Sequence, residues 1–328
     1  MSLDYGVLCH SRLTSKYYLP VVVNSSNFTE LSSVATKAEE LGYHGVGVGE
    51  HYSLPGKPNN RPDPFVVLST LVPKTTKLRL GTMASSATVR HPVILANSAL
   101  SLHALSGGRS FLCLGVGSGN NAEYASHGFR YVTNAERLNA FEEIIAIIRG
   151  LSTNRHGFTF DGKTYRLDAS TLNLTNEFPP VWIGERRSSR LLKLGGRYAD
   201  VLNIHCRSPS DAEKKLKVAR LAAKEAGRGK ETPTLVLKHF VVMEPDQDML
   251  VEALGYPNER QEGESKAAFI DRMRKENPEA IIGTQDQVRA EYEMYISAGF
   301  TEFSPILLPN TIGEINIRME VFAKHCFA

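Results

Sequence analysis

The chain has 328 residues, of which 42% are hydrophobic and 22% are charged, and this composition is that of an ordinary globular protein. Disorder, collagen-like repeats and small disulfide-stapled scaffolds are thereby excluded. The net charge of +3 is not concentrated in one basic block, which favours a small-molecule ligand over nucleic acid or an anionic membrane as the main partner.

Short apolar runs alternate with segments of helical period along the chain, as is typical of βαβ units around a parallel sheet. Most runs are continuously apolar, as expected when helices cover one face of a sheet and a packed interior the other. The predicted strands begin near Leu3, Gly45, Lys77, Ser110, Pro180, Ala199, Thr234 and Glu302. Eight such units close a barrel, so the sequence predicts an α/β protein with the TIM (β/α)8 architecture.

Helices are predicted where apolar residues recur every three or four positions, as in 31–41 and 141–151. The basic run 213–220 has its apolar positions on one face, so we interpret its charges as the solvent side of a barrel helix. Helix starts are predicted by capping-box pairs, namely Thr133 with Glu136, Thr284 with Gln287 and Thr311 with Glu314.

Two intervals between predicted strands are much longer than the rest, which indicates insertions after strands 4 and 7, at about 115–179 and 242–285. The first contains an Asp161-Gly162 turn between alternating residues, typical of a β-hairpin over 157–167. The second, roughly 244–282, is charged and predicts exposed helices over one end of the barrel. We therefore expect one domain over 1–328, with the excess length in these insertions.

The four cysteines form no C-x-x-C pair, and no histidine pair has the spacing of metal ligands, so we expect reduced thiols and no metal site. The N-terminus has no basic region followed by an apolar stretch, and no apolar run approaches the ~18 residues that span a bilayer. These features favour a cytoplasmic protein. The cysteines are Cys9, Cys113, Cys206 and Cys326.

Function in such barrels is located at the carboxyl ends of the strands. His51 follows the second predicted strand directly, where an imidazole can exchange protons with a bound substrate; the alternative is a histidine that simply pairs with a neighbouring carboxylate. The glycine-rich segment 114–121 allows a ligand to approach the backbone or, equally, allows close packing of strands. It does not match G-x-G-x-x-G, because Asn120 stands where the third glycine belongs.

The segment GERRSS (184–189) lies between a predicted strand and a predicted helix. It offers two guanidiniums, two hydroxyls and backbone amides at a helix N-terminus, which is the donor set of a phosphate site. The alternative is a solvated helix cap with incidental arginines.

Four segments, 89–119, 160–167, 179–203 and 283–300, together resemble the luciferase-like monooxygenase superfamily, which includes bacterial luciferase-like proteins and coenzyme F420-dependent oxidoreductases. The resemblance extends over nearly the whole chain. It implies a TIM barrel, usually a homodimer, that binds FMN or the deazaflavin coenzyme F420 and acts on a small-molecule substrate.

The resemblance also implies roles for individual residues. His51, with Glu50 as its acidic partner, would be the catalytic residue beside the flavin ring. Met83-Ala84 would carry the non-prolyl cis peptide of the family. The cofactor would be bound by Thr82, Met83, Ala84, Ser118, Asn120, Gly184, Glu185, Arg186, Arg187, Ser188 and Ser189, and the substrate by His10, Tyr52 and His205.

The sequence departs from some members of the superfamily. Asn120 occupies a position where deazaflavin-dependent sugar-phosphate dehydrogenases tend to have an acid, which puts that proton-transfer role in doubt. Tyr52 replaces the second histidine of true luciferases, so we expect no light emission. The RHP motif (90–92) and the segment 184–203 are closer to deazaflavin-type members, which slightly favours F420 over FMN.

The expected activity is redox of a small organic substrate, by hydride transfer with F420 or by oxygen activation with FMN. His51 would transfer the proton and Glu50 would orient it. Two alternatives remain: a flavin-binding relative without catalysis, and a two-domain nicotinamide dehydrogenase. The second would need a glycine at position 120 and a helix directly after it.

Overall fold

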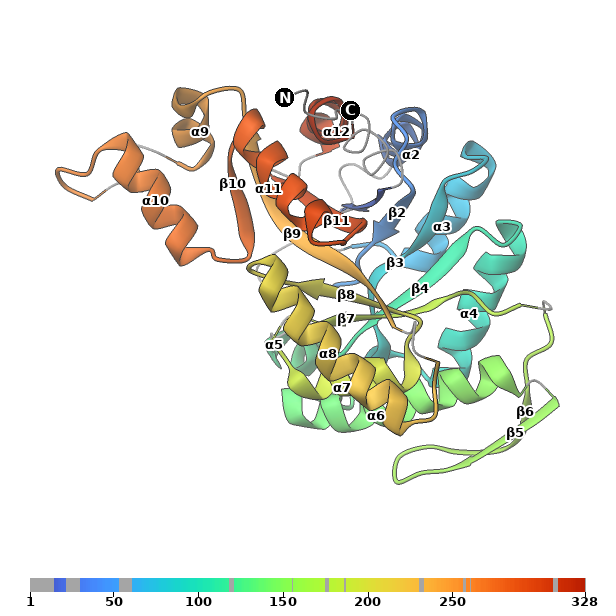
Figure 1. The fold of residues 1–328 in the computed structure, drawn as a ribbon. Helices are drawn as coiled ribbons and strands as arrows, with labels where there is room; N and C mark the ends of the chain where they lie inside the picture. The colour runs from blue at the N-terminus through green and yellow to red at the C-terminus, as the bar shows by residue number, and fades with distance from the viewer. Residues whose placement is uncertain are drawn as a thin grey trace, which may run out of the picture.

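The computed structural model describes residues 15–21, 30–52, 61–117, 121–154, 156–174, 177–185, 187–229, 233–255, 258–259, 261–308 and 312–327. In this part of the chain eight parallel strands form a closed barrel, because β8 pairs with β9 and β11 pairs with β1 (Figure 1). In order around the barrel the strands are β1 (Lys16–Val21), β2 (Gly45–Val48), β3 (Arg79–Ser86), β4 (Ser110–Gly115), β7 (Val181–Glu185), β8 (Val201–His205), β9 (Thr234–Glu244) and β11 (Glu302–Leu308).

The predicted (β/α)8 barrel is confirmed, and seven of its strands begin within two residues of the predicted positions. The first strand is the exception. The strand that joins β2 to β11 is Lys16–Val21, whereas the predicted run near Leu3 lies outside the described residues. Pro20 explains the error, since proline is unusual inside a sheet and argues against a central strand.

The helices outside the barrel bury the apolar faces that their sequence periodicity predicts. The Thr133–Glu136 capping box is present, and the Gln287 side chain accepts a hydrogen bond of 3.0 Å from the Thr284 amide; Thr311 lies outside the described residues. The helices are α2 (Leu31–Glu40), α3 (Pro64–Leu71), α4 (Pro92–Leu105), α5 (Asn121–Ser126), α6 (Asn134–Thr153), α7 (Ser189–Tyr198), α8 (Pro209–Glu225), α11 (Gln285–Ser297) and α12 (Ile312–Cys326), with 3-10 turns at Val72–Lys74 and Ala87–Val89.

The first insertion contains the predicted hairpin, formed by β5 (His156–Asp161) and β6 (Arg166–Thr171). Its turn is held against α6, because the Glu143 carboxylate accepts hydrogen bonds from the amides of Thr164 and Tyr165 at 2.9 and 3.1 Å. In Figure 1 this hairpin lies at the lower right, at the opposite end of the molecule from the second insertion.

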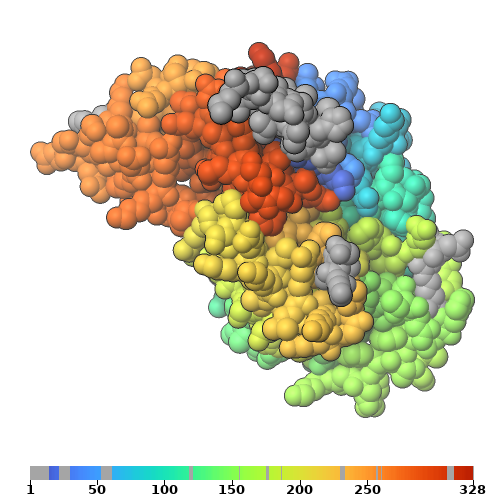
Figure 2. Space-filling model, in the orientation of Figure 1, coloured from blue at the N-terminus to red at the C-terminus, as the bar shows by residue number. Residues whose placement is uncertain are grey.

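The second insertion contains the predicted helices, α9 (Gln247–Ala253) and α10 (Lys266–Glu276), and one strand that was not predicted. This strand, β10 (Ala280–Thr284), pairs with the second half of β9, beyond the point where β8 ends. The barrel wall is therefore taller on this side. The insertion forms the lobe that projects at the upper left of Figures 1 and 2.

The interior of the barrel is filled by large side chains below its open end. Phe111 and Trp182 stack with ring centroids 4.4 Å apart, and Tyr18 packs edge-on against Trp182. Glycine at position 47 provides the room for Met83, because a Cβ atom there would lie 2.4 Å from the Met83 Cβ. The interior is thus a packed core with a floor, as in other closed eight-stranded barrels.

Among the described residues, no helix combines the length and the apolar character needed to cross a membrane. Cys113, Cys206 and Cys326 are buried free thiols, and Cys9 lies outside the described residues.

We expect Gly47→Ala to lower the free energy of unfolding by about 1–3 kcal/mol, because the added methyl group overpacks the interior against Met83. Gly229→Ala is the control, since no atom lies within 4 Å of its added Cβ, and it should change stability by about 0.5 kcal/mol or less. Urea unfolding would measure both variants. Equal midpoints would contradict the packing argument.

Candidate active site

The carboxyl ends of β2, β3, β4 and β7 meet at one rim of the barrel. Ala84 lies at their centre, next to three glycines: a Cβ atom added to Gly115 or Gly184 would lie 3.4 or 3.8 Å from the Ala84 Cβ, and one added to Gly49 would lie 3.4 Å from the carbonyl oxygen of Met83. The Met83–Ala84 peptide is cis, as predicted, and the pairing of β3 with β4 shifts at this point. The rim therefore has a floor without large side chains.

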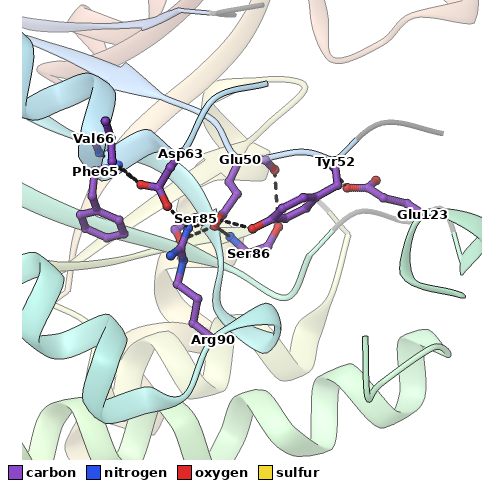
Figure 3. Close-up of polar contacts among 9 residues, drawn as sticks. All are labelled: Glu50, Tyr52, Asp63, Phe65, Val66, Ser85, Ser86, Arg90 and Glu123. Carbon is purple, nitrogen blue, oxygen red and sulfur yellow. Dashed lines mark hydrogen bonds and ion pairs between the residues drawn. The ribbon is translucent and has the colours of Figure 1, made fainter. Parts of the chain in front are cut away.

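Glu50 is the most heavily bonded side chain of this rim. Its carboxylate is 4% exposed and accepts hydrogen bonds from the Ser85 hydroxyl at 2.6 Å and the Ser86 amide at 2.9 Å. The Tyr52 hydroxyl donates to it at 3.0 Å, and Arg90 forms an ion pair with it (Figure 3). A buried carboxylate with this many donors links β2 to β3 and to the start of α4.

The RHP motif is explained by the same network. The Arg90 guanidinium also contacts Asp63 at 2.7 Å, and Asp63 in turn caps α3 by accepting from the Phe65 amide (Figure 3). His91 caps α4 through its ring, and Pro92 occupies the first turn of that helix. The motif thus positions two helices relative to the rim.

The carboxylate next to His51 is that of Glu123 on α5. Its Oε2 atom lies 3.5 Å from His51 Nδ1, and its Oε1 atom accepts from the Tyr52 amide at 2.8 Å. The carboxylate of Glu50 is instead bonded to Ser85, Ser86, Tyr52 and Arg90, so the orienting role of Glu50 toward His51 stays a prediction. Glu123 is missed by sequence reasoning because it is distant in the chain and no spacing links it to His51.

The imidazole of His51 is 44% exposed, whereas the side chain of Glu123 is 6% exposed. Partial burial and the nearby Arg61 guanidinium lower the pKa of His51, and Glu123 counteracts this shift. His51 is therefore mostly neutral near pH 7 and can accept a proton at the open rim.

The side chain of Tyr52 is partly buried between aromatic neighbours. Its ring packs edge-on against Phe129, with centroids 4.9 Å apart, and beside His127 at 5.6 Å. Burial, together with the Glu50 carboxylate, raises its pKa. The hydroxyl is thus a fixed donor to Glu50.

The segment 184–189 lies at the opposite side of the rim and opens on a pocket of about 260 Å³. The pocket is lined by three basic residues and three acidic ones, together with two serines. These are Arg187, Arg207, Lys215, Glu185, Asp211, Glu279, Ser188 and Ser189. Ser188 caps α7 by accepting from the Leu191 amide at 3.3 Å. This is the location predicted for an anion.

The pocket includes the predicted Arg187, Ser188 and Ser189 and adds two basic residues, Arg207 and Lys215, that were not predicted. The buried Glu185 carboxylate accepts a hydrogen bond from the Ser188 amide at 2.5 Å, so this amide is already occupied. The same carboxylate also pairs with Lys215 Nζ at 3.1 Å. Burial raises the pKa of Glu185, while Lys215 and the Ser188 amide counteract the shift. Lys215, interpreted from sequence as a solvated charge, is 17% exposed and points into the pocket; sequence periodicity cannot distinguish such a lysine from its exposed neighbours.

Two other predicted residues have defined partners. The Thr82 hydroxyl donates to the Cys113 carbonyl at 2.7 Å and accepts from its amide, so it joins β3 to β4 and is occupied within the wall. His205 is buried at the end of β8 and stacks on Phe240 with centroids 5.3 Å apart. His10, Ser118, Asn120 and Arg186 lie outside the described residues.

The described residues fit a phosphorylated flavin or deazaflavin in outline. Ala84 and the three glycines form a surface of small residues, over which a ligand can approach the backbone closely. The pocket with Arg187, Arg207 and Lys215 suits a phosphate. Asn203 on β8 is 1% exposed, and the Nδ2 atom of its side chain has no hydrogen-bond partner among the described residues.

Comparison with known proteins establishes the family. The family model of luciferase-like monooxygenases matches residues 3–302, and this chain belongs to that family.

Two curated relatives share 30% identity with parts of the chain. One is a 5,10-methylenetetrahydromethanopterin reductase of Methanolobus tindarius, matched over 206 residues, which is 63% of this chain and 59% of the relative. The other is a phthiodiolone/phenolphthiodiolone dimycocerosates ketoreductase of Mycobacterium tuberculosis, matched over 198 residues, which is 58% of this chain and 50% of the relative. The chain thus spans about half to three fifths of the length of these relatives.

Solved structures agree on the fold. An F420-dependent secondary alcohol dehydrogenase in complex with an F420–acetone adduct superposes with a TM-score of 0.75 at 18% identity, covering 95% of this chain and 98% of that one. The oxygenating constituent of 3,6-diketocamphane monooxygenase from Pseudomonas putida, in complex with FMN, superposes with a TM-score of 0.70 at 16% identity, with the same coverage.

We expect Glu123→Gln to lower the pKa of His51 further, because the substitution removes the negative charge that favours the imidazolium. The titration of His51, followed by NMR of its ring, measures the shift without any substrate. Glu142→Gln on α6 is the control, since Glu142 pairs with Arg190 away from His51. An unchanged or raised pKa in the Glu123 variant would contradict the pairing.

Proposed function

We propose that this protein is an oxidoreductase that uses F420 or FMN to oxidise or reduce a small organic substrate. The observation that carries the proposal is the combination, at one rim, of a floor of small residues around Ala84, a titratable His51–Glu123 pair and a separate pocket that contains three basic side chains. These three parts have different roles, because the floor accommodates a flat ring, His51 accepts or donates a proton, and the pocket binds a phosphate.

The cofactor would supply hydride transfer if it is F420, or oxygen activation if it is FMN. Arg187, Lys215, Ser188 and Ser189 would bind its phosphate, and Ala84 would lie under its ring. F420 is favoured slightly, because the RHP motif and the segment 184–203 resemble deazaflavin-type members.

His51 is assigned the proton transfer. Because burial holds its pKa below the ordinary value, the neutral imidazole prevails near pH 7 and can accept the proton released when an alcohol is oxidised. Glu123 positions the ring and stabilises the imidazolium that forms, while Glu50 acts indirectly by holding the rim together. His205 and Tyr52 would border the substrate.

We further propose that the chain functions as a single-domain cytoplasmic homodimer. Val66 on α3 and Ile94 on α4 are 62% and 58% exposed on helices that contact each other, which supports an interface there. The buried free thiols fit a reducing compartment.

Replacement of Arg187 tests the phosphate pocket. We expect Arg187→Gln to weaken binding of F420 and FMN at least tenfold, and to reduce the salt dependence of binding, because one pocket cation is lost. Spectroscopic titration with each cofactor measures both effects and also shows which cofactor binds more tightly. Arg190→Gln is the control, because Arg190 pairs with Glu142 outside the pocket. Equal affinities in the two variants would contradict the assignment.

Replacement of His51 tests the proton transfer. With either cofactor and a panel of secondary alcohols, ketones and aldehydes, turnover is followed by the change in the visible spectrum of the cofactor. We expect His51→Ala to lower kcat/KM by roughly 100-fold to 10,000-fold, the contribution of a general base. In the wild type, alcohol oxidation should slow as the pH falls through the pKa of His51, which lies below the ordinary value of an imidazole.

The control for this test is His156→Ala, since His156 is exposed on the hairpin. A His51→Ala change within threefold would refute the proton transfer. Cofactor binding without turnover of any substrate would instead identify a non-catalytic flavin-binding relative.

A further inference from the structure

An apolar cavity of about 550 Å³ lies under the second insertion, outside the pocket that would bind the phosphate. Its wall is the face of β9 and β10 that carries Phe240 and Val242, together with their paired neighbours Ala280 and Ile282. Leu254 at the end of α9 and Met273 of α10 close the other side. The volume is within the range of pockets that bury most of a small ligand.

The cavity adjoins the phosphate pocket at one side of the candidate active site. Side chains alternate along a strand, so Phe240 faces the same way as Val236, which belongs to the interior core of the barrel. Phe240 also stacks on His205 at the rim. Arg187 and Glu279 line both this cavity and the phosphate pocket. A molecule in the cavity would therefore reach the rim without crossing the barrel wall.

The charges around the cavity disfavour an anionic occupant. Among the described lining residues the cation is Arg187, and its Nε atom is already 2.9 Å from the Glu279 carboxylate. The other carboxylate, Glu276, is paired with Arg272 at 3.3 Å. Both acids thus have partners, and Arg187 is the residue that the proposed function assigns to the cofactor phosphate. The described lining therefore holds no further cation that would offset the desolvation of a second bound anion.

We propose that this cavity binds the uncharged apolar body of the substrate, such as an alkyl chain or an aliphatic ring, and that the substrate is a hydrophobic alcohol or carbonyl compound rather than a phosphorylated or carboxylated one. The assignment rests on the proposed function for the reacting group, whereas the binding site itself rests on the cavity alone. Each methylene group buried there raises binding about fourfold, the factor that corresponds to about 0.8 kcal/mol.

A binding experiment on the full-length protein without added cofactor tests the cavity. The protein is first loaded with the neutral fluorescent dye Nile red. The displacement of the dye by 2-hexanone, 2-octanone, 2-decanone and decanoate is then measured. We expect saturable displacement that strengthens with chain length, with decanoate at least tenfold weaker than 2-decanone. Ala280→Phe, which fills the cavity from β10, should weaken the binding of 2-decanone at least tenfold. Ala267→Phe on the exposed face of α10 is the control, and its affinity for 2-decanone should stay within twofold of the wild type.

A second variant guards against misfolding of the first. Leu254→Glu places a carboxylate on the opposite wall of the cavity and should also weaken the binding of 2-decanone at least tenfold. Circular dichroism shows whether each variant is folded. Equal binding of decanoate and 2-decanone, or unchanged binding in a folded Ala280→Phe or Leu254→Glu protein, would overturn the proposal.

Turnover separates this inference from the proposed function. If the ketones bind as expected but no cofactor supports their reduction, the proposed function fails and the apolar site stands. If reduction occurs with a kcat/KM that is the same for 2-hexanone and 2-decanone, the function stands and the apolar site is wrong. A kcat/KM that rises with chain length and loses this dependence in Ala280→Phe supports both.

Discussion

The carboxylate of Glu50 is buried, and the hydrogen bonds it accepts come from separate segments of the rim. A buried charge of this kind is stable only when donors surround it, and removal of one partner from such a pair costs about 3–5 kcal/mol. The requirement fixes the end of β2 against the end of β3 and, through Arg90, against the starts of α3 and α4. The floor beside Ala84 and the position of His51 both depend on this arrangement.

A second buried carboxylate organises the opposite side of the rim. Glu185 connects the end of β7 to α8, because it binds both the Ser188 amide and Lys215. Lys215 also donates to the carbonyl of His205 at 2.6 Å, which includes the end of β8 in the same cluster. The two carboxylates therefore hold the two sides of the mouth separately. Ala84 and the glycines that pack around it lie at the ends of the strands between them.

The height of the barrel wall is uneven, and this bears on selectivity. β10 continues the wall beyond β8, and a small apolar cluster of Val242, Leu250, Phe269, Ile270 and Ile282 packs α9 and α10 onto it. The result is an apolar cavity on one side of the mouth and a charged pocket next to it, with the Arg187–Glu279 ion pair lining both.

Local patterns in the chain were sufficient for the architecture: apolar runs located seven barrel strands, the capping box at Thr133 located a helix start, and the resemblance placed the cis peptide at Met83–Ala84. The position of the pocket next to Ser188 also follows from local order, because a strand, a serine cap and a helix are adjacent in sequence. The partners of the site residues do not follow from local order in the sequence. Glu123 next to His51, Lys215 under Glu185 and β10 on β9 are brought together by the closure of the barrel across long separations in the chain, and burial rather than spacing decides which carboxylate or lysine is enclosed.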